Sequence, residues 1–297
     1  MRTRFLAGRL LLFPLTILLG GLLGATLARL APGFGSDDRE LDSRLSTASL
    51  QALRQSRAAQ GDLPTFYKNY LAGLLHGDLG FSPSLRRPVR ELLAERIPVT
   101  VRGVGLGLAG GWLLGLCLAV PAAMCRAPFF DLFGSALSGV FLCLPSALLA
   151  LLLVLVGGPA PLAICFVVFP RVFRYTRNLL IETRDLPHVL MARAKGASSA
   201  RILFRHVTPP AAPQLLALAG VSVATALGAA IPVEVLCDLP GVGQLAWLAA
   251  LGRDLPLLVN LTALATAATL MATSVSDFAT WRLAGANSGS ELEGASI

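Results

Sequence analysis

The sequence has few charged residues for its length. Only 14% of its 297 residues are Asp, Glu, Lys or Arg, whereas 55% are hydrophobic, and the mean hydropathy is +0.69. Soluble domains carry about a quarter charged residues, so this chain lacks the polar groups that would cover a surface in water. The composition therefore predicts a polytopic membrane protein.

Aromatic residues are also scarce, at 7% of the chain, although the net charge is +8. Nucleic-acid-binding surfaces combine basic stripes with aromatic side chains on which bases stack, and no such combination occurs here. The positive charges gather instead in particular loops, a pattern typical of membrane orientation. We therefore expect no nucleic-acid partner.

Catalytic and metal-binding motifs are missing as well. The three histidines form no HExxH pattern, the five cysteines form no CxxC pair, and no GxSxG segment occurs. The two lysines, Lys68 and Lys195, precede Asn and Gly, so the chain has no GxxxxGK[ST] phosphate loop. We expect no catalytic residue, no metal site and no cofactor on this chain. A membrane enzyme would need a constellation that the sequence does not offer.

Six apolar segments are predicted to cross the membrane as helices, because the bilayer core tolerates no unpaired backbone groups. They cover residues 10–30, 100–124, 132–156, 161–173, 213–236 and 255–278. The first follows Arg2, Arg4 and Arg9 as in a signal peptide, but it is long enough to span, and we expect it to be retained. The fourth is the weakest segment, because Arg171 and Arg174 lie near its end.

Loop charges predict the orientation. The N-terminal tail and the loop between the fourth and fifth segments are rich in arginine, and that loop has only Glu182 and Asp185 as acids. Placing the N-terminal tail and this loop in the cytoplasm satisfies the positive-inside rule. With six crossings, the C-terminus then also lies in the cytoplasm. We expect a tail with a first span at 1–31, an external segment at 32–97, a membrane core at 98–282 and a disordered tail at 283–297. The external segment can serve as a cap on the core or as a docking surface.

The cytoplasmic loop, residues 174–210, has the pattern of two short helices. Asp185 can cap a helix that has Pro187 in its first turn, and Arg193 and Lys195 suit its last turn. Gly196 is placed for the left-handed position that ends the helix, and Ser198 or Ser199 can cap a second helix over 200–207. This arrangement could transmit movement between spans as a lever. It also fits a basic hairpin anchored on anionic lipid.

Ala192-Arg193-Ala194-Lys195-Gly196, followed by Arg205-His206, resembles the docking loop of the dipeptide/oligopeptide/nickel branch of ABC-importer permeases. Other segments resemble the same family in the same order. These are the GDLGFS segment from Gly77, the RIPVT segment from Arg96, Glu234 with the LPGVG segment from Leu239, and the RDLP segment from Arg253. The chain departs from the family at Thr208-Pro209-Pro210, where an Arg-Asn pair is usual.

The resemblance implies an all-α polytopic membrane protein with six transmembrane helices of the type I ABC-importer permease type and a long external segment after the first helix. It implies a multi-pass protein of the bacterial inner membrane that imports peptides without being an enzyme. The implied partners are a second homologous permease, two cytoplasmic ATPase subunits that carry ATP and Mg, and a periplasmic or lipid-anchored substrate-binding protein. An ion-coupled secondary transporter or channel is the alternative. It would need acids within the spans, where the sequence offers only the boundary residues Glu234 and Asp277.

The resemblance also implies particular residues. Those that dock on the ATPase, in the coupling loop at 174–210, are Asp185, Ala192, Arg193, Ala194, Lys195, Gly196, Arg205 and His206. An external re-entrant loop is implied at Glu234, Pro240, Gly241 and Gly243, with the two glycines as turn residues. Glu234 is open to two interpretations, a functional acid at membrane depth or an interfacial carboxylate that caps this loop.

Overall fold

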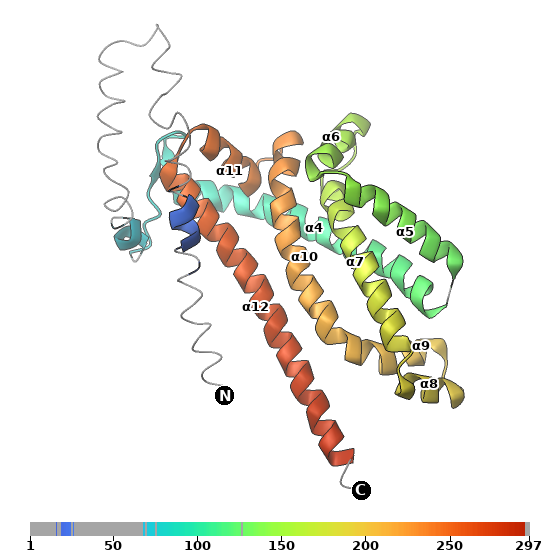
Figure 1. Cartoon of the computed structure of the whole chain (residues 1–297). Coiled ribbons are helices and arrows are strands. Elements are labelled where there is room, and N and C mark those ends of the chain that lie inside the picture. The colour runs from blue at the N-terminus through green and yellow to red at the C-terminus, as the bar shows by residue number, and fades with distance from the viewer. Residues whose placement is uncertain are drawn as a thin grey trace, which may run out of the picture. The chain divides into compact units, whose positions relative to one another are not determined.

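The computed structural model describes residues 16, 19–24, 26, 68, 70–74, 76–125 and 127–294, with side chains as far as residue 282. Apart from one small hairpin, the elements from Phe81 onward are helices (Figure 1). The elements are β1 (Phe81–Ser82), β2 (Arg87–Pro88), α4 (Val89–Met124), α5 (Pro128–Cys143), α6 (Ser146–Val156), α7 (Pro161–Arg184), α8 (Pro187–Ala194), α9 (Ser199–Ile202), a π-helix (Leu203–Val207), α10 (Thr208–Leu236), α11 (Val242–Leu251) and α12 (Leu255–Gly294).

The chain forms two compact units. One consists of Met1–Ile97 and Leu245–Ala267, and the other of Pro98–Gln244 and Ala268–Ile297. In the second unit α7 packs against α5, α6 and α10 (Figure 1). Its core is aliphatic and aromatic, with Phe169 and Phe173 fully buried and the rings of Phe141 and Phe166 stacked at 4.3 Å.

Glycines let α4 approach α7 closely, as small residues do between membrane helices. A Cβ at Gly107 would lie 2.6 Å from the Ile164 Cβ, and a Cβ at Gly115 would lie 2.7 Å from the Val172 Cγ1. Both positions therefore exclude any side chain. A Cβ at Gly105, by contrast, would meet nothing within 4 Å. One side of the glycine-rich stretch of α4 is thus closely packed against α7.

The predicted spans agree with the structure in part. By length and composition three described helices could each cross a membrane, namely Val89–Met124, Ser199–Leu236 and Leu255–Arg282. The third predicted span, 132–156, is wrong as a single helix, because α5 and α6 meet at a 103° bend. Pro145 causes the break by holding Leu144 extended, at φ −90° and ψ 123°. Of the first predicted span, the described residues 16, 19–24 and 26 are helical.

The fourth predicted span was expected to end at residue 173, but α7 continues to Arg184. Three arginines of the predicted loop, Arg174, Arg177 and Arg184, lie on this longer helix, and each has a partner on a neighbouring element. Hydrogen bonds from these guanidinium groups to neighbouring helices compensate the charged side chains, so the helix continues past the apolar stretch. The loop therefore begins about ten residues later than the apolar pattern indicated.

In the first unit the β1–β2 hairpin is fastened to the start of α12. Asp254 is only 2% exposed and accepts hydrogen bonds from the Ser82 hydroxyl and from the Ser84 backbone and hydroxyl. Its other oxygen accepts from the Leu257 N–H at 3.1 Å, as an N-cap carboxylate does. On the exposed side of the hairpin, hydrogen bonds to Glu95 raise the pKa of Arg87. This part of the segment that was predicted to be external is thus packed against the start of α12.

Candidate functional site

The candidate docking element is α8, which follows α7 almost directly. Its N-cap is Leu186, an extended residue at φ −66° and ψ 145°, and Pro187 stands in its first turn. The prediction that Asp185 caps this helix is wrong, because Pro187 forces the residue before it out of the helical region. Asp185 instead ends α7, and its Oδ1 accepts from the Nε of Arg184 at 3.2 Å.

The end of α8 is the left-handed turn that the sequence predicted. Gly196 has φ +75°, its N–H donates to the Arg193 carbonyl at 3.0 Å, and the Ala197 N–H donates to the Ala192 carbonyl at 3.2 Å. This pair of bonds is a Schellman motif. A Cβ at Gly196 would meet nothing within 4 Å, so backbone conformation rather than space requires glycine.

One side of α8 is packed and the other is open. Val189 joins a buried cluster with Ala123 of α4, Leu180 of α7, and Ile202 and Val207. The opposite side exposes Leu190, Met191 at 63%, Arg193 and Lys195, and Phe204 of the π-helix is 72% exposed nearby in the sequence. A helix that is fixed to the membrane helices on one side therefore presents apolar and cationic groups on the other.

The predicted second helix is continuous with the fifth span. Ser198 stands at the N-cap of α9 as expected, although its side chain makes no capping bond. The chain then passes through the π-helix into α10 without a break, despite Pro209 and Pro210. The wider π turn makes room for proline rings, which would clash with the carbonyls of a regular α-helix.

A side chain of α8 contacts this π-helix. Pro210 has no N–H to donate to the carbonyl of His206, four residues earlier. The Nε2 of His188 lies 3.2 Å from that carbonyl oxygen and can supply the donor in the tautomer protonated at Nε2. The Thr208-Pro209-Pro210 departure from the family pattern thus coincides with a direct link from α8 to the π-helix that leads into α10.

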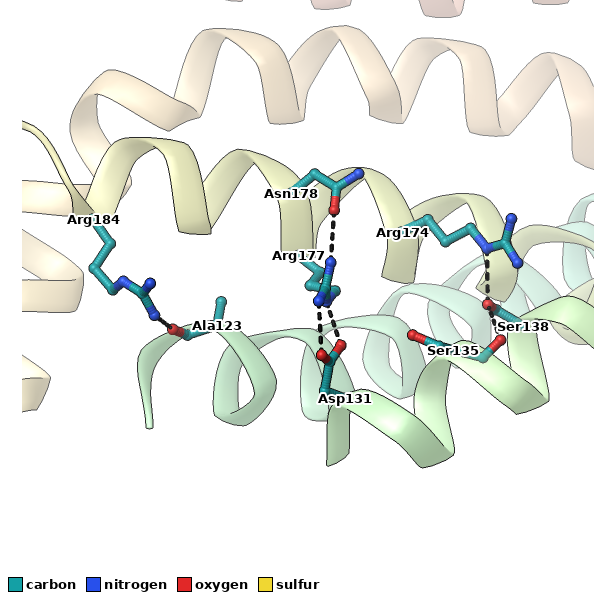
Figure 2. A network of polar contacts seen from close by, with 8 residues as sticks. All are labelled: Ala123, Asp131, Ser135, Ser138, Arg174, Arg177, Asn178 and Arg184. Atoms are coloured by element: carbon teal, nitrogen blue, oxygen red, sulfur yellow. Dashed lines mark hydrogen bonds and ion pairs between the residues drawn. The ribbon is translucent and has the colours of Figure 1, made fainter. Parts of the chain in front are cut away.

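Three arginines of α7 hold it to α4 and α5 (Figure 2). Arg177 makes a bidentate pair with Asp131 of α5, with one bond of 2.7 Å from Nη2 to Oδ2. Arg184 is buried and donates to the carbonyl of Ala123, in the last turn of α4. Arg174 donates to the Ser138 hydroxyl at 3.0 Å. Since α8 follows Arg184 after two residues, this network fixes where α8 begins.

The predicted re-entrant loop is centred on Glu234, which is 4% exposed at the end of α10. Its Oε1 accepts from the Thr100 hydroxyl at 2.6 Å, and its Oε2 accepts from the backbone N–H groups of Gly243 at 2.6 Å and Gln244 at 3.2 Å. Thr100 also accepts from the Val242 N–H at 2.7 Å. The carboxylate therefore caps the N-terminus of α11, where negative charge is favourable. This geometry supports the capping interpretation of Glu234.

The glycines of this loop are required for space. A Cβ at Gly241 would overlap the Glu234 carboxylate, and a Cβ at Gly243 would lie 2.7 Å from the Ile231 Cα. Neither glycine has a positive φ; Gly241 lies at the bend before α11, and Gly243 lies within α11. Pro240 precedes them at an exposed position. Two contacts of the site, Thr100 and His188, were missed, because nothing in the sequence pairs them with Glu234 and His206.

In the part of the chain that the structure describes, no group of three His, Cys, Asp or Glu residues could hold a metal ion. The described cysteines are all free.

Comparison with known proteins completes the description. A putative peptide transport system permease of Brucella suis is 29% identical over 70% of this chain and 76% of its own. The oligopeptide transport system permease OppB of Escherichia coli K12 is 33% identical over 67% of this chain and 72% of its own. The inward-facing MetNI methionine ABC transporter has a chain with 22% identity and a TM-score of 0.49, covering 67% of this chain and 93% of its own. Residues 111–284, which include α8 and Glu234, match the family of binding-protein-dependent transport system inner membrane components. The chain belongs to this family of ABC-importer permeases.

Proposed function

We propose that the chain forms half of the translocation pathway of an ATP-driven peptide importer and that α8 receives the movement of a separate ATPase. The observation that carries this proposal is the two-sided character of α8, with Val189 packed among the membrane helices and Leu190, Met191 and Arg193 exposed. Relatives named as peptide and oligopeptide permeases support a peptide cargo.

The contacts around α8 indicate how movement would pass into the membrane. The buried cluster joins it to α4, α7, α9 and the π-helix. His188 also contacts the π-helix, and Arg184 joins the end of α7 to α4. A displacement of α8 would therefore move these helices together. Closure of the ATPase pair would in this way rock the spans between inward and outward openings.

The remaining partners follow from the family. We infer a second homologous permease, two cytoplasmic ATPase subunits that bind ATP and Mg, and an external substrate-binding protein. The inner membrane would hold the chain with both termini in the cytoplasm, since the arginines of α7, α8 and α9 then lie inside. Asp185, Ala194, Arg205 and His206 would flank the docking surface.

An ion-coupled mechanism has less support. The buried acid that it would need, Glu234, already accepts three hydrogen bonds and caps α11. Glu234 is therefore better explained as a structural acid.

The test is uptake into proteoliposomes that hold the co-purified permease and ATPase subunits. We expect peptide uptake only with ATP inside and binding protein outside. Arg193→Glu should reduce both ATPase co-purification and uptake, whereas the same charge reversal at the exposed Arg90, in the first turn of α4, should change neither. Uptake by the permease without any ATPase would contradict the proposal.

A further inference from the structure

The exposed side of α7 carries a row of polar residues. Arg171, Tyr175, Asn178 and Glu182 are all exposed, and their spacing of four, three and four residues places them on one side of the helix. The exposed large side chains of α4 and α5 include Leu106, Leu113 and Phe133, which suit a lipid environment. The row on α7 therefore suits water or a polar ligand.

This row continues onto α10, which packs beside α7 (Figure 1). Arg171 donates from Nη1 to the Thr225 hydroxyl at 2.7 Å, and Tyr175 donates to the Gln214 side chain at 3.3 Å. Both bonds lie on exposed surface and join the two helices along one shared polar strip. The strip consists of Arg171, Tyr175, Gln214 and Thr225.

Arg171 lies deep between the ends of both helices. It stands ten residues after Pro161, the first residue of α7, which is about 15 Å along the axis. Thr225 stands eleven residues before Leu236, the last residue of α10, which is about 16 Å. The hydrocarbon core is about 30 Å thick, so Arg171 would lie near its middle where the Pro161 end of α7 and the Leu236 end of α10 reach the membrane surface.

Among the described residues, Arg171 and Arg174 have only a neutral hydroxyl as hydrogen-bond partner, whereas the other two arginines of α7 have a carboxylate. Arg177 has a carboxylate from Asp131, and Arg184 has the carboxylate of Asp185. Within the described ranges Arg171 forms no ion pair, and its hydrogen-bond partner is the neutral Thr225 hydroxyl. An exposed cation at mid-membrane is costly against lipid, and such residues mark substrate pathways.

We propose that the polar strip lines the translocation pathway and that Arg171 binds a carboxylate of the passing cargo. This inference rests on the proposed function as a peptide importer, because free peptides carry a C-terminal carboxylate. The guanidinium can bind a carboxylate through two parallel N–H donors. Thr225 holds the guanidinium from α10. Because no carboxylate of the described residues pairs with Arg171, its remaining donors are open to cargo.

The test compares three cargoes in proteoliposomes of the complete complex with saturating binding protein. Trialanine has only a C-terminal carboxylate, trialanine amide has none, and the amide of Ala-Glu-Ala has only a side-chain carboxylate. For each cargo, the uptake rate of Arg171→Gln is divided by that of the wild type, which removes the preference of the binding protein. We expect this ratio to fall at least about tenfold further for trialanine than for its amide, because a hydrogen bond to a charged group is lost.

Two further variants and the third cargo show which group of the peptide Arg171 binds. Arg171→Lys should recover part of the trialanine rate, since it keeps the positive charge. A selective loss for the Ala-Glu-Ala amide as well would show that any carboxylate of the cargo binds, whereas a loss for trialanine alone would assign the C-terminus. Arg174→Gln removes the same charge on the side facing Ser138, and it should affect all cargoes equally.

An equal loss for every cargo in Arg171→Gln would overturn the inference, because Arg171 would then pair with a neighbouring subunit or support the fold. Failure of the proposed function looks different, since the wild type would then show no ATP-dependent uptake of any peptide.

Whether position 171 lines the pathway can be tested separately by cysteine labelling, in a variant whose five native cysteines are replaced by alanine. There, Arg171→Cys should react with a membrane-impermeant thiol reagent and trialanine should slow the reaction, whereas Leu155→Cys, at a side chain 74% exposed, should not respond to trialanine. Labelling at position 171 that ignores the peptide would also overturn the inference.

Discussion

Replacing Glu234 by glutamine should separate the ends of α10 and α11 from α4. The carboxylate accepts bonds from the Thr100 hydroxyl and from two backbone N–H groups, so the neutral amide must place its NH2 group against one of these donors. It also loses the charge that strengthens each bond. With a net loss of about 1 kcal/mol per bond, the free energy of unfolding should fall by about 3 kcal/mol.

The assay is thermal unfolding of the purified complex in detergent, followed by the fluorescence of a thiol dye or of tryptophan. A loss of about 3 kcal/mol corresponds to a lowering of Tm by roughly 6–12 °C in a chain of this size class. The matched control is Glu91→Gln, because the Glu91 carboxylate is 59% exposed and pairs with Arg87 at 3.5 Å. Exposed pairs contribute less than about 1 kcal/mol, so its Tm should hardly move. An equal Tm for Glu234→Gln and the wild type would refute the capping role.

Further predictions concern packing and the docking segment. Gly115→Leu should lower the free energy of unfolding by about 3 kcal/mol in a thermal melt, because it would overlap Val172, whereas Gly105→Leu should change it little. Gly196→Ala should cost about 1–2 kcal/mol through its left-handed backbone and should reduce uptake per ATP hydrolysed; unchanged coupling in transport assays would count against this segment as a lever. His188→Ala should uncouple ATP hydrolysis from uptake and His188→Gln should restore part of it, and equal coupling ratios in the two variants would disprove the link to His206.

The sequence predicted the elements that depend on local chemistry. Gly196 could be placed in a left-handed turn because the preceding pattern ends a helix and glycine alone adopts that conformation freely. Pro187 was correctly expected in a first turn, but its effect on the residue before it was overlooked, and the cap was therefore assigned to Asp185.

Tertiary contacts could not be predicted in the same way. From its sequence context Arg177 is predicted to lie in a loop. It lies instead on α7, which extends beyond its apolar stretch because Asp131 of α5 pairs with Arg177. The glycines of α4 look alike in sequence, yet Gly115 is enclosed and Gly105 is open. Glu234 was recognised as important, but its capping role depends on Thr100, which lies far away in the chain.

Site-specific photo-cross-linking from position 191 tests the central claim most directly. Met191 is 63% exposed on α8, and a photoreactive side chain there should not disturb the packed side that contains Val189. In membranes that contain the whole transporter, position 191 should cross-link to an ATPase subunit, whereas position 155 on α6 should not. Cross-linking from position 191 to lipid alone would mean that α8 is an interfacial anchor and would contradict the account.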